Sequence, residues 1–423
     1  MRRYDYPPGT PMMTPLMMSQ NPLFPPTPQI TAMNPFQNKN NNKKQTFTKQ
    51  WTQDHFKNIN GPLVLQAGQH ALTENIKIAF QKNTVPASVL FKIPENTQIV
   101  FDFQSFSLDT DFHVHENFSL FELEKNATLI LSHGNVSTKR GKCISGSGNV
   151  ALRDVVFTNY GDYAVWITDA REVLVKECMF INGNENQIGG AAQLFYDELS
   201  NLKEESQIEY QRQQNKFTLQ MDQVKTSQLN HQLPVAIHCE NVSKITINQN
   251  KFETHVMTLY TLLKHHSHPL QMISLKQCPA VDIFQCHFEC KSALVEQPRT
   301  WPLECRVFDV VVIDCEDCSR VQLDKNIFSK VYAEMGHATC VHFNRCSMIK
   351  IKSTQIHHLN AGSESLNRNQ VSRDPQAIGF FINESVFAQE NTTVENIFSI
   401  AQPFTTCIQE YPAGRTTLLL QKV

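Results

Sequence analysis

From about residue 61 onward, apolar residues come in short runs in which alternate positions are apolar. Val89-Leu-Phe-Lys-Ile93 and Gln98-Ile-Val-Phe-Asp102 are two such runs, and Asn, Gly, Ser and Asp separate the runs from one another. A period of two is typical of β-strands, and patterns with a helical period are almost absent. The hydrophobic pattern therefore predicts an all-β fold for residues 61–410.

The runs share an internal repeat. Two apolar residues stand at alternate positions and, after four intervening residues, a Phe or Ile follows as an anchor. A further apolar pair lies fifteen and thirteen residues before most anchors. The spacings between anchors are 23, 72, 36, 40 and 28 residues. The anchors are Phe157, Phe180, Phe252, Phe288, Phe328 and Ile356.

The repeat predicts an interior built from columns of like side chains. Strands that stack at a fixed repeat point their alternate residues inward, so that each coil covers the core of its neighbour. We expect the phenylalanine anchors to stack on one another and a column of small thiols to run beside them. The residues of this interior ladder are Phe252, Phe288, Phe328, Cys278, Cys318 and Cys346.

Coils of roughly 22–28 residues with loops of varying length are typical of a parallel β-helix. In this pattern of repeats the chain resembles the pectate-lyase-like superfamily of single-stranded parallel β-helices. The resemblance and the general crossover preference imply a right-handed coil. Phe398 does not repeat the inward spacing, and we expect residues 380–400 to form an atypical terminal coil.

The composition changes along the chain and suggests its boundaries. The first segment is rich in Pro, Met and Asn and is predicted to be a disordered arm, and a Gln/Glu-rich stretch is predicted to be a loop or helix that leaves the solenoid. The predicted segments are the arm at 1–50, an N-terminal cap with first coils at 51–125, the coils at 126–410 with an excursion at 197–231, and a tail at 411–423.

Composition excludes some functions and suggests a compartment. A net charge of −2 argues against a nucleic-acid-binding protein, and no apolar run reaches the roughly 18 residues of a membrane helix. The N-terminus lacks the apolar stretch of a secretory signal, so the 12 Cys are expected to be reduced. We expect folding in the cytoplasm without classical secretion, with the cytosol, a host cell or a virion as the final location.

Aligning the repeats predicts columns of outward-facing residues, and catalytic or metal-binding residues would be found in such columns. Ser274, Asp314 and His342 fall consecutively in one column, but the Asp stands between the Ser and the His, which is the wrong order for a relay. His113 and His115 share a strand face, but no third ligand can be assigned. We therefore predict no metal site and no cofactor.

The superfamily resemblance implies a different candidate site. Its lyases hold Ca²⁺ with carboxylates on adjacent coils and use Arg or Lys as a base, and the nearest counterparts are Asp282, Asp324, Lys350 and Lys352. The two Asp fall in different columns, and the paired-Asp motifs of the related hydrolases are missing. The sequence leaves open whether the chain is an enzyme, and the missing motifs argue against it. Ca²⁺ is expected only for a lyase.

Three functions remain. The first is a non-catalytic structural or interaction protein, such as a virion component, that binds other proteins through its arm or through 197–231. Such a protein can also form a homo-oligomer. The second is a polysaccharide-active lyase, epimerase or hydrolase. The third is a carbohydrate-binding, spike-like module in which Trp166 and Phe284 stack on sugars. The fold alone does not decide among them.

Overall fold

The computed structural model describes the strand-rich part of the chain, and all described residues belong to one compact unit, residues 44–423. The described residues are 47–57, 59, 61–78, 88–110, 118–138, 141–182, 234–258, 269–294, 309–333, 336–361, 377–383, 385, 387–390, 393–399 and 406–411. The side chains of 256–258, of 292–294 and from 387 onward are not described.

Two sheets and one short 3₁₀-helix, η1 (Gln53–Phe56), make up the described structure. The 11-stranded sheet contains β2 (Leu63–Val64), β5 (Val89–Ile93), β8 (Ser119–Leu123), β10 (Lys142–Gly146), β12 (Tyr163–Thr168), β15 (Val235–Glu240), β18 (Leu270–Lys276), β21 (Val310–Glu316), β24 (Ala338–Asn344), β27 (Ala377–Asn383) and β30 (Thr406–Tyr411). The 19-stranded sheet contains β1 (Lys49–Trp51), β3 (Gly68–Leu72), β4 (Ile76–Ile78), β6 (Gln98–Asp102), β7 (Ser107–Thr110), β9 (Thr128–Thr138), β11 (Asn149–Thr158), β13 (Glu172–Lys176), β14 (Met179–Asn182), β16 (Lys244–Asn248), β17 (Lys251–Thr258), β19 (Ala280–Phe284), β20 (His287–Leu294), β22 (Arg320–Asp324), β23 (Ile327–Ala333), β25 (Met348–Lys352), β26 (Gln355–Ala361), β28 (Phe387–Glu390) and β29 (Thr393–Ser399).

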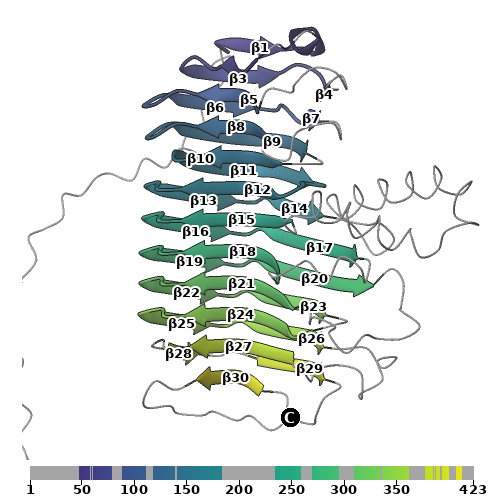
Figure 1. Ribbon diagram of the computed structural model, residues 1–423, viewed down its shortest axis with the longest axis vertical. Coiled ribbons are helices and arrows are strands. Elements are labelled where there is room, and N and C mark those ends of the chain that lie inside the picture. The colour runs from purple at the N-terminus through teal and green to yellow at the C-terminus, as the bar shows by residue number, and fades with distance from the viewer. Residues whose placement is uncertain are drawn as a thin grey trace, which may run out of the picture. The chain divides into compact units, whose positions relative to one another are not determined.

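The strands form a parallel β-helix, as the repeat predicts. One coil runs through β18, β19 and β20, and the next coil runs through β21, β22 and β23, each strand pairing in parallel with its counterpart. Figure 1 shows these coils stacked in chain order. β1 already begins within the predicted arm, whose residues 1–46 lie outside the described part, as do the excursion at 197–231 and residues 412–423 of the tail.

The anchors of the sequence repeat lie in register, because each coil places its inward residues directly on those of its neighbour. Phe288 pairs with Phe252 on one side and with Phe328 on the other, and the ring centroids are 4.9 Å apart in both pairs. The column also extends beyond the predicted anchors at both ends. Its members are Ile76, Leu108, Val136, Phe157, Phe180, Phe252, Phe288, Phe328, Ile356 and Val394.

Phe398 departs from the column as the sequence indicates, since it pairs with Asn360. The terminal coil nevertheless keeps the repeat, because Val394 takes the anchor position opposite Ile356. A β-branched aliphatic residue in place of the aromatic one hides this coil from a search for phenylalanine.

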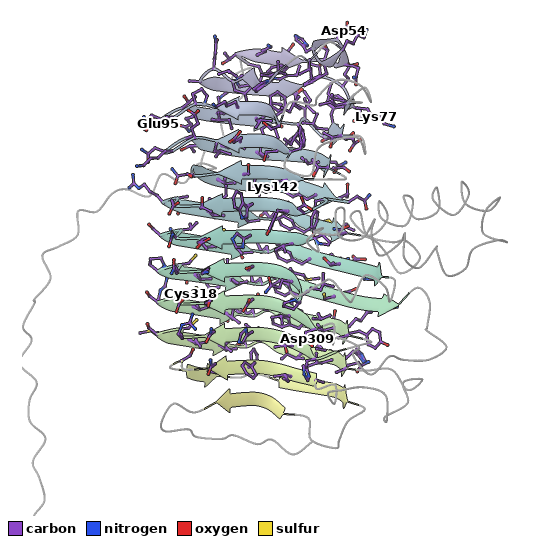
Figure 2. All side chains as sticks on the ribbon, viewed as in Figure 1. Asp54, Lys77, Glu95, Lys142, Asp309 and Cys318 are labelled. Atoms are coloured by element: carbon purple, nitrogen blue, oxygen red, sulfur yellow. The ribbon has the colours of Figure 1, made fainter. Side chains whose placement is uncertain are left out.

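The cysteine column lies at the turn between the two sheets, where Figure 2 labels Cys318. Cys278, Cys318 and Cys346 are buried, and the thiol of each donates to a main-chain carbonyl of the preceding coil at 3.5–3.7 Å. The carbonyl that Cys346 contacts belongs to Cys315, which stands three residues before Cys318 and is also buried. Small side chains suit this position because the chain bends sharply there.

Each coil bends at residues in the left-handed region of φ. These residues keep their N–H groups in the ladder, as Gln277 donates to Glu316 O at 2.8 Å and Gln285 donates to Asp324 O at 2.9 Å. Glycine would be the least strained choice, so the native polar residues keep the turn at a conformational cost. The two turn columns in the middle coils are Asp169, Asn241, Gln277, Asp317 and Arg345, and Glu177, Gln249, Gln285, Lys325 and Ser353.

Two buried asparagines bridge successive coils at the second of these turns. Asn326 accepts a hydrogen bond from Cys286 N at 3.0 Å and donates to Ile283 O at 2.9 Å. Asn250 makes the equivalent pair of bonds to the coil before it. Their side chains satisfy backbone groups that the sharp turn takes out of the ladder.

An aromatic group covers the first coils of the core. Trp51 from β1 and Phe56 from η1 pack on Phe91, with centroids 5.2 and 5.9 Å from its ring. Trp51 Nε1 also donates to Nδ1 of the buried His70 at 3.3 Å. β1 and η1 thus pack on the first described coils of the core.

Candidate functional site: the outer face of the 11-stranded sheet

The outer face of the 11-stranded sheet carries two central columns of side chains, which we call the aromatic face. Two consecutive inward residues, such as Met272 and Ile273, separate the columns on each strand, so positions three residues apart share the outer face and the coils stack them in register. Column one comprises Lys142, Tyr163, Val235, Gln271, Val311, Thr339 and Ile378, and column two comprises Ser145, Trp166, His238, Ser274, Asp314, His342 and Phe381.

Three aromatic rings gather at one end of this face. Trp166 and His238 are stacked with centroids 6.4 Å apart, and Tyr163 lies 5.7 Å from His238. Lys142 belongs to the preceding coil, and its Nζ lies 3.9 Å from the centroid of the Trp166 ring, on the side opposite His238. The faces of the indole ring are therefore occupied by neighbours in the chain, which leaves its edge for a ligand.

Burial in this cluster lowers the pKa of two ionisable groups. Partial burial lowers the pKa of Lys142, against the opposing pull of Asp162. Burial also lowers the pKa of His238, so its imidazole is neutral near pH 7. His238 Nδ1 and Ser274 Oγ are hydrogen-bonded at 3.2 Å, which orients the imidazole.

Ser274, Asp314 and His342 lie in one column in the order that the repeat alignment gives. Ser274 bonds to His238 on one side, whereas Asp314 Oδ1 and His342 Nδ1 are 2.8 Å apart on the other. Gln271 Nε2 donates to the second oxygen of Asp314 at 2.7 Å. Serine and aspartate thus bond to different histidines, which is not the order of a Ser–His–Asp relay.

The lyase candidates lie on the 19-stranded sheet and do not converge. Asp282 pairs with Gln322 in the ladder and accepts a hydrogen bond from Arg320 Nη2 at 3.0 Å. Asp324 lies on the next coil in a different column, between Phe284 and Lys352. Lys350 follows Gln322 in the column of Asp282. This placement gives a series of separate polar residues and no pair of facing carboxylates for Ca²⁺.

Ion pairs between coils lie on the 19-stranded sheet and at the turn that borders the aromatic face. Lys244 Nζ lies 2.8 Å from Glu172 Oε1, and Arg345 reaches both Glu316 and Asp317 at 2.6 Å. The guanidinium lowers the pKa of Asp317 through a side-chain hydrogen bond. These side chains join neighbouring coils and are already partnered within the chain.

One group of potential metal ligands was missed at the sequence level. Glu253, His255 and Glu289 converge on the outer side of β17 and β20. Their signal in the sequence is positional, since the glutamates directly follow two anchors, Phe252 and Phe288, and the histidine stands two residues further on. His113 and His115 lie outside the described residues.

Comparisons with protein-family models, with curated proteins and with solved structures gave no match. In the described ranges, none of the helical structure has the length and apolar character needed to cross a membrane.

Proposed function

We propose that the chain is a non-catalytic interaction protein, a β-helix scaffold that binds a partner protein through its aromatic face. The composition of this face carries the proposal. Between β10 and β27 the face has fourteen residues, of which Lys142 and Asp314 have ordinarily charged side chains, while Tyr, Trp, His, Phe and aliphatic residues fill most other positions. Charged residues appear where column two continues before β10, at Glu122 and Lys92. Protein interfaces have the same character, with charges depleted at the centre and aromatic residues enriched.

The burial of this face supports the same role. Val235 and Ile378 are only 3% and 5% exposed, so their neighbours already hold these side chains in place. Trp166, His238 and His342 are half-buried by contacts along the columns. Side chains that are already held in place lose little conformational entropy on binding, so more of the contact energy contributes to affinity.

Competing surfaces and competing ligands fit less well. The other outward surfaces carry ionic pairs such as Lys244–Glu172, and desolvating them on binding is costly. A sugar ring stacks on a free aromatic face, whereas Lys142 and His238 flank the ring of Trp166. A partner protein that packs against ring edges and aliphatic groups suits this surface better. The role also suits a component of a larger particle, such as a virion.

Site-specific cross-linking tests the proposal. A photo-crosslinking residue at Val311 probes the aromatic face, and one at Gln322, on the same coil but on the 19-stranded sheet, is the matched control. The experiment uses the full chain, first purified at increasing concentration to detect pairing between copies, then in extracts of the cells that produce it. We expect one discrete cross-linked partner from position 311 and none from 322.

A second variant separates binding from folding. Trp166→Ala should abolish the cross-link at 311 while leaving the far-UV circular dichroism spectrum unchanged, because a Trp in an interface is a typical hot spot worth about 2 kcal/mol or more. Equal cross-linking from both positions would contradict the proposal. Turnover of a polyuronate that is lost in Asp314→Asn would replace it with a catalytic function.

A further inference from the structure

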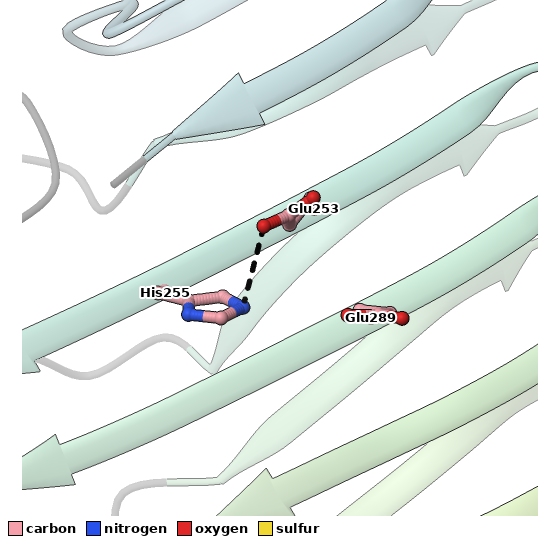
Figure 3. A group of neighbouring side chains, drawn as sticks. All are labelled: Glu253, His255 and Glu289. Carbon is pink, nitrogen blue, oxygen red and sulfur yellow. Dashed lines mark ion pairs between the residues drawn. The ribbon is translucent and has the colours of Figure 1, made fainter. Parts of the chain in front are cut away.

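The cluster of Glu253, His255 and Glu289 has the arrangement of a metal site. Glu253 and His255 stand two residues apart on β17 and share its outer side, while Glu289 on β20 is in register with Glu253. Figure 3 shows the first two side chains on one strand and the third on the neighbouring strand. One ligand atom from each residue lies within 4.8 Å of the other two, and His255 Nε2 is 3.9 Å from Glu253 Oε1.

The three ligands are held in a packed environment. The His255 side chain is 7% exposed, and those of Glu253 and Glu289 are 20% and 15% exposed. Two carboxylates directly opposite in a ladder repel each other, and partial burial strengthens that repulsion. A histidine buried between such carboxylates adds a third ligand of the type that transition metals prefer.

Three lysines border the cluster, and two of them pair with its carboxylates and compete with a metal for them. Lys251 Nζ lies 2.7 Å from Glu253 Oε2, Lys330 Nζ lies 3.6 Å from Glu289 Oε2, and Lys291 follows His255 in the ladder. The side chains of Lys251 and Lys330 are 39% and 62% exposed, and exposed pairs of this kind are weak and screened by salt. Both of these lysines contact Oε2 atoms, whereas Glu253 Oε1 faces His255.

We propose that Glu253, His255 and Glu289 bind one Zn²⁺ ion, which joins two consecutive coils of the solenoid. One imidazole and two carboxylates are a donor set suited to zinc, and three protein ligands leave the fourth tetrahedral position to water. Ligand atoms around such an ion are about 3.4 Å apart, given bonds near 2.1 Å. The present separations reach up to 4.8 Å, so binding requires the two glutamate side chains to rotate toward the ion. The inference does not depend on the aromatic face.

Calorimetric titration of the full chain with Zn²⁺ tests this site, with Co²⁺ absorption as a spectroscopic readout of the ligand field. We expect one ion per chain and a rise in Tm when it binds, because the ion stabilises the folded state. Glu289→Gln and His255→Gln should each weaken Zn²⁺ binding by more than about tenfold. Glu172→Gln removes an equivalent ion-pair carboxylate elsewhere and should bind like the wild type.

Lys251→Gln provides a test in the opposite direction. Removing this competing cation should strengthen Zn²⁺ binding several-fold, a gain that a folding defect cannot produce. Two results would overturn the inference: no Zn²⁺ binding by the wild-type chain, or equal binding by the wild type, Glu289→Gln and His255→Gln. The second result would place any bound zinc elsewhere on the chain.

Discussion

The phenylalanine column makes a quantitative prediction about stability. Phe288 is fully buried and lies between Phe252 and Phe328, with interplanar angles of 9° and 14° to their rings. Truncation to alanine removes this ring from a closely packed core, so Phe288→Ala should lower the free energy of unfolding by about 3–5 kcal/mol.

Leucine variants separate stacking from burial. Phe288→Leu keeps most of the apolar area but loses two stacked pairs, each worth about 0.5–1.5 kcal/mol, so it should cost about 1–3 kcal/mol. Phe328→Leu loses one stacked pair, because the next residue in its column is Ile356. The difference between the two leucine variants should therefore be one pair, about 0.5–1.5 kcal/mol.

Urea unfolding followed by circular dichroism measures these free energies on the full chain. Because coils of a solenoid can open separately, amide hydrogen exchange in β17, β20 and β23 should accompany it. The local opening free energy of these strands should be lowest in Phe288→Ala, higher in Phe288→Leu and highest of the three in Phe328→Leu. Equal costs for the two leucine variants would refute the stacking term, and a cost below about 1 kcal/mol for Phe288→Ala would refute the packed column itself.

Three further predictions concern the thiols, the turns and pH. Cys278, Cys318 and Cys346 should resist a thiol reagent until the chain is unfolded, because they are buried, and mass spectrometry of labelled peptides checks each site. Gln285 is exposed with φ of 51°, so Gln285→Val should destabilise the chain by about 1–2 kcal/mol in urea unfolding, whereas Gln285→Gly should be neutral or stabilising. Burial lowers the folded-state pKa of His238, so the unfolded chain binds more protons below the ordinary histidine pKa and stability falls as the pH drops from about 7 to about 5. His238→Gln should reduce that slope, and a variant with an unchanged or steeper slope would contradict the assignment.

The interior of the middle coils could be predicted from the sequence because its columns repeat one chemistry. Phe252, Phe288 and Phe328 occupy equivalent positions, and loops of different length between them leave the register intact. The first coils were harder to align, since Leu108 and Val136 hold the same column with aliphatic residues that also occur at many other positions.

The outward columns could be aligned from the sequence, but their bonding could not. A residue in a column has two neighbours, and the repeat does not say which one it contacts. Asp314 turns to His342 and Gln271, while Ser274 turns to His238, because rotamers and ring contacts decide the direction. The sequence places these residues together and leaves their chemistry to the structure.

Departures from repetition are where function can lie in a solenoid. A column that only stabilises the fold keeps its residue type from coil to coil, as the phenylalanines do. The column of His255 changes to Lys291 in the next coil, and the column of Trp166 changes to His238 and then to Ser274. Coil stacking alone requires neither change, since an outward column can repeat one polar residue from coil to coil. Both proposals, the partner protein at the aromatic face and the Zn²⁺ ion at His255, therefore concern columns whose residue type changes from coil to coil.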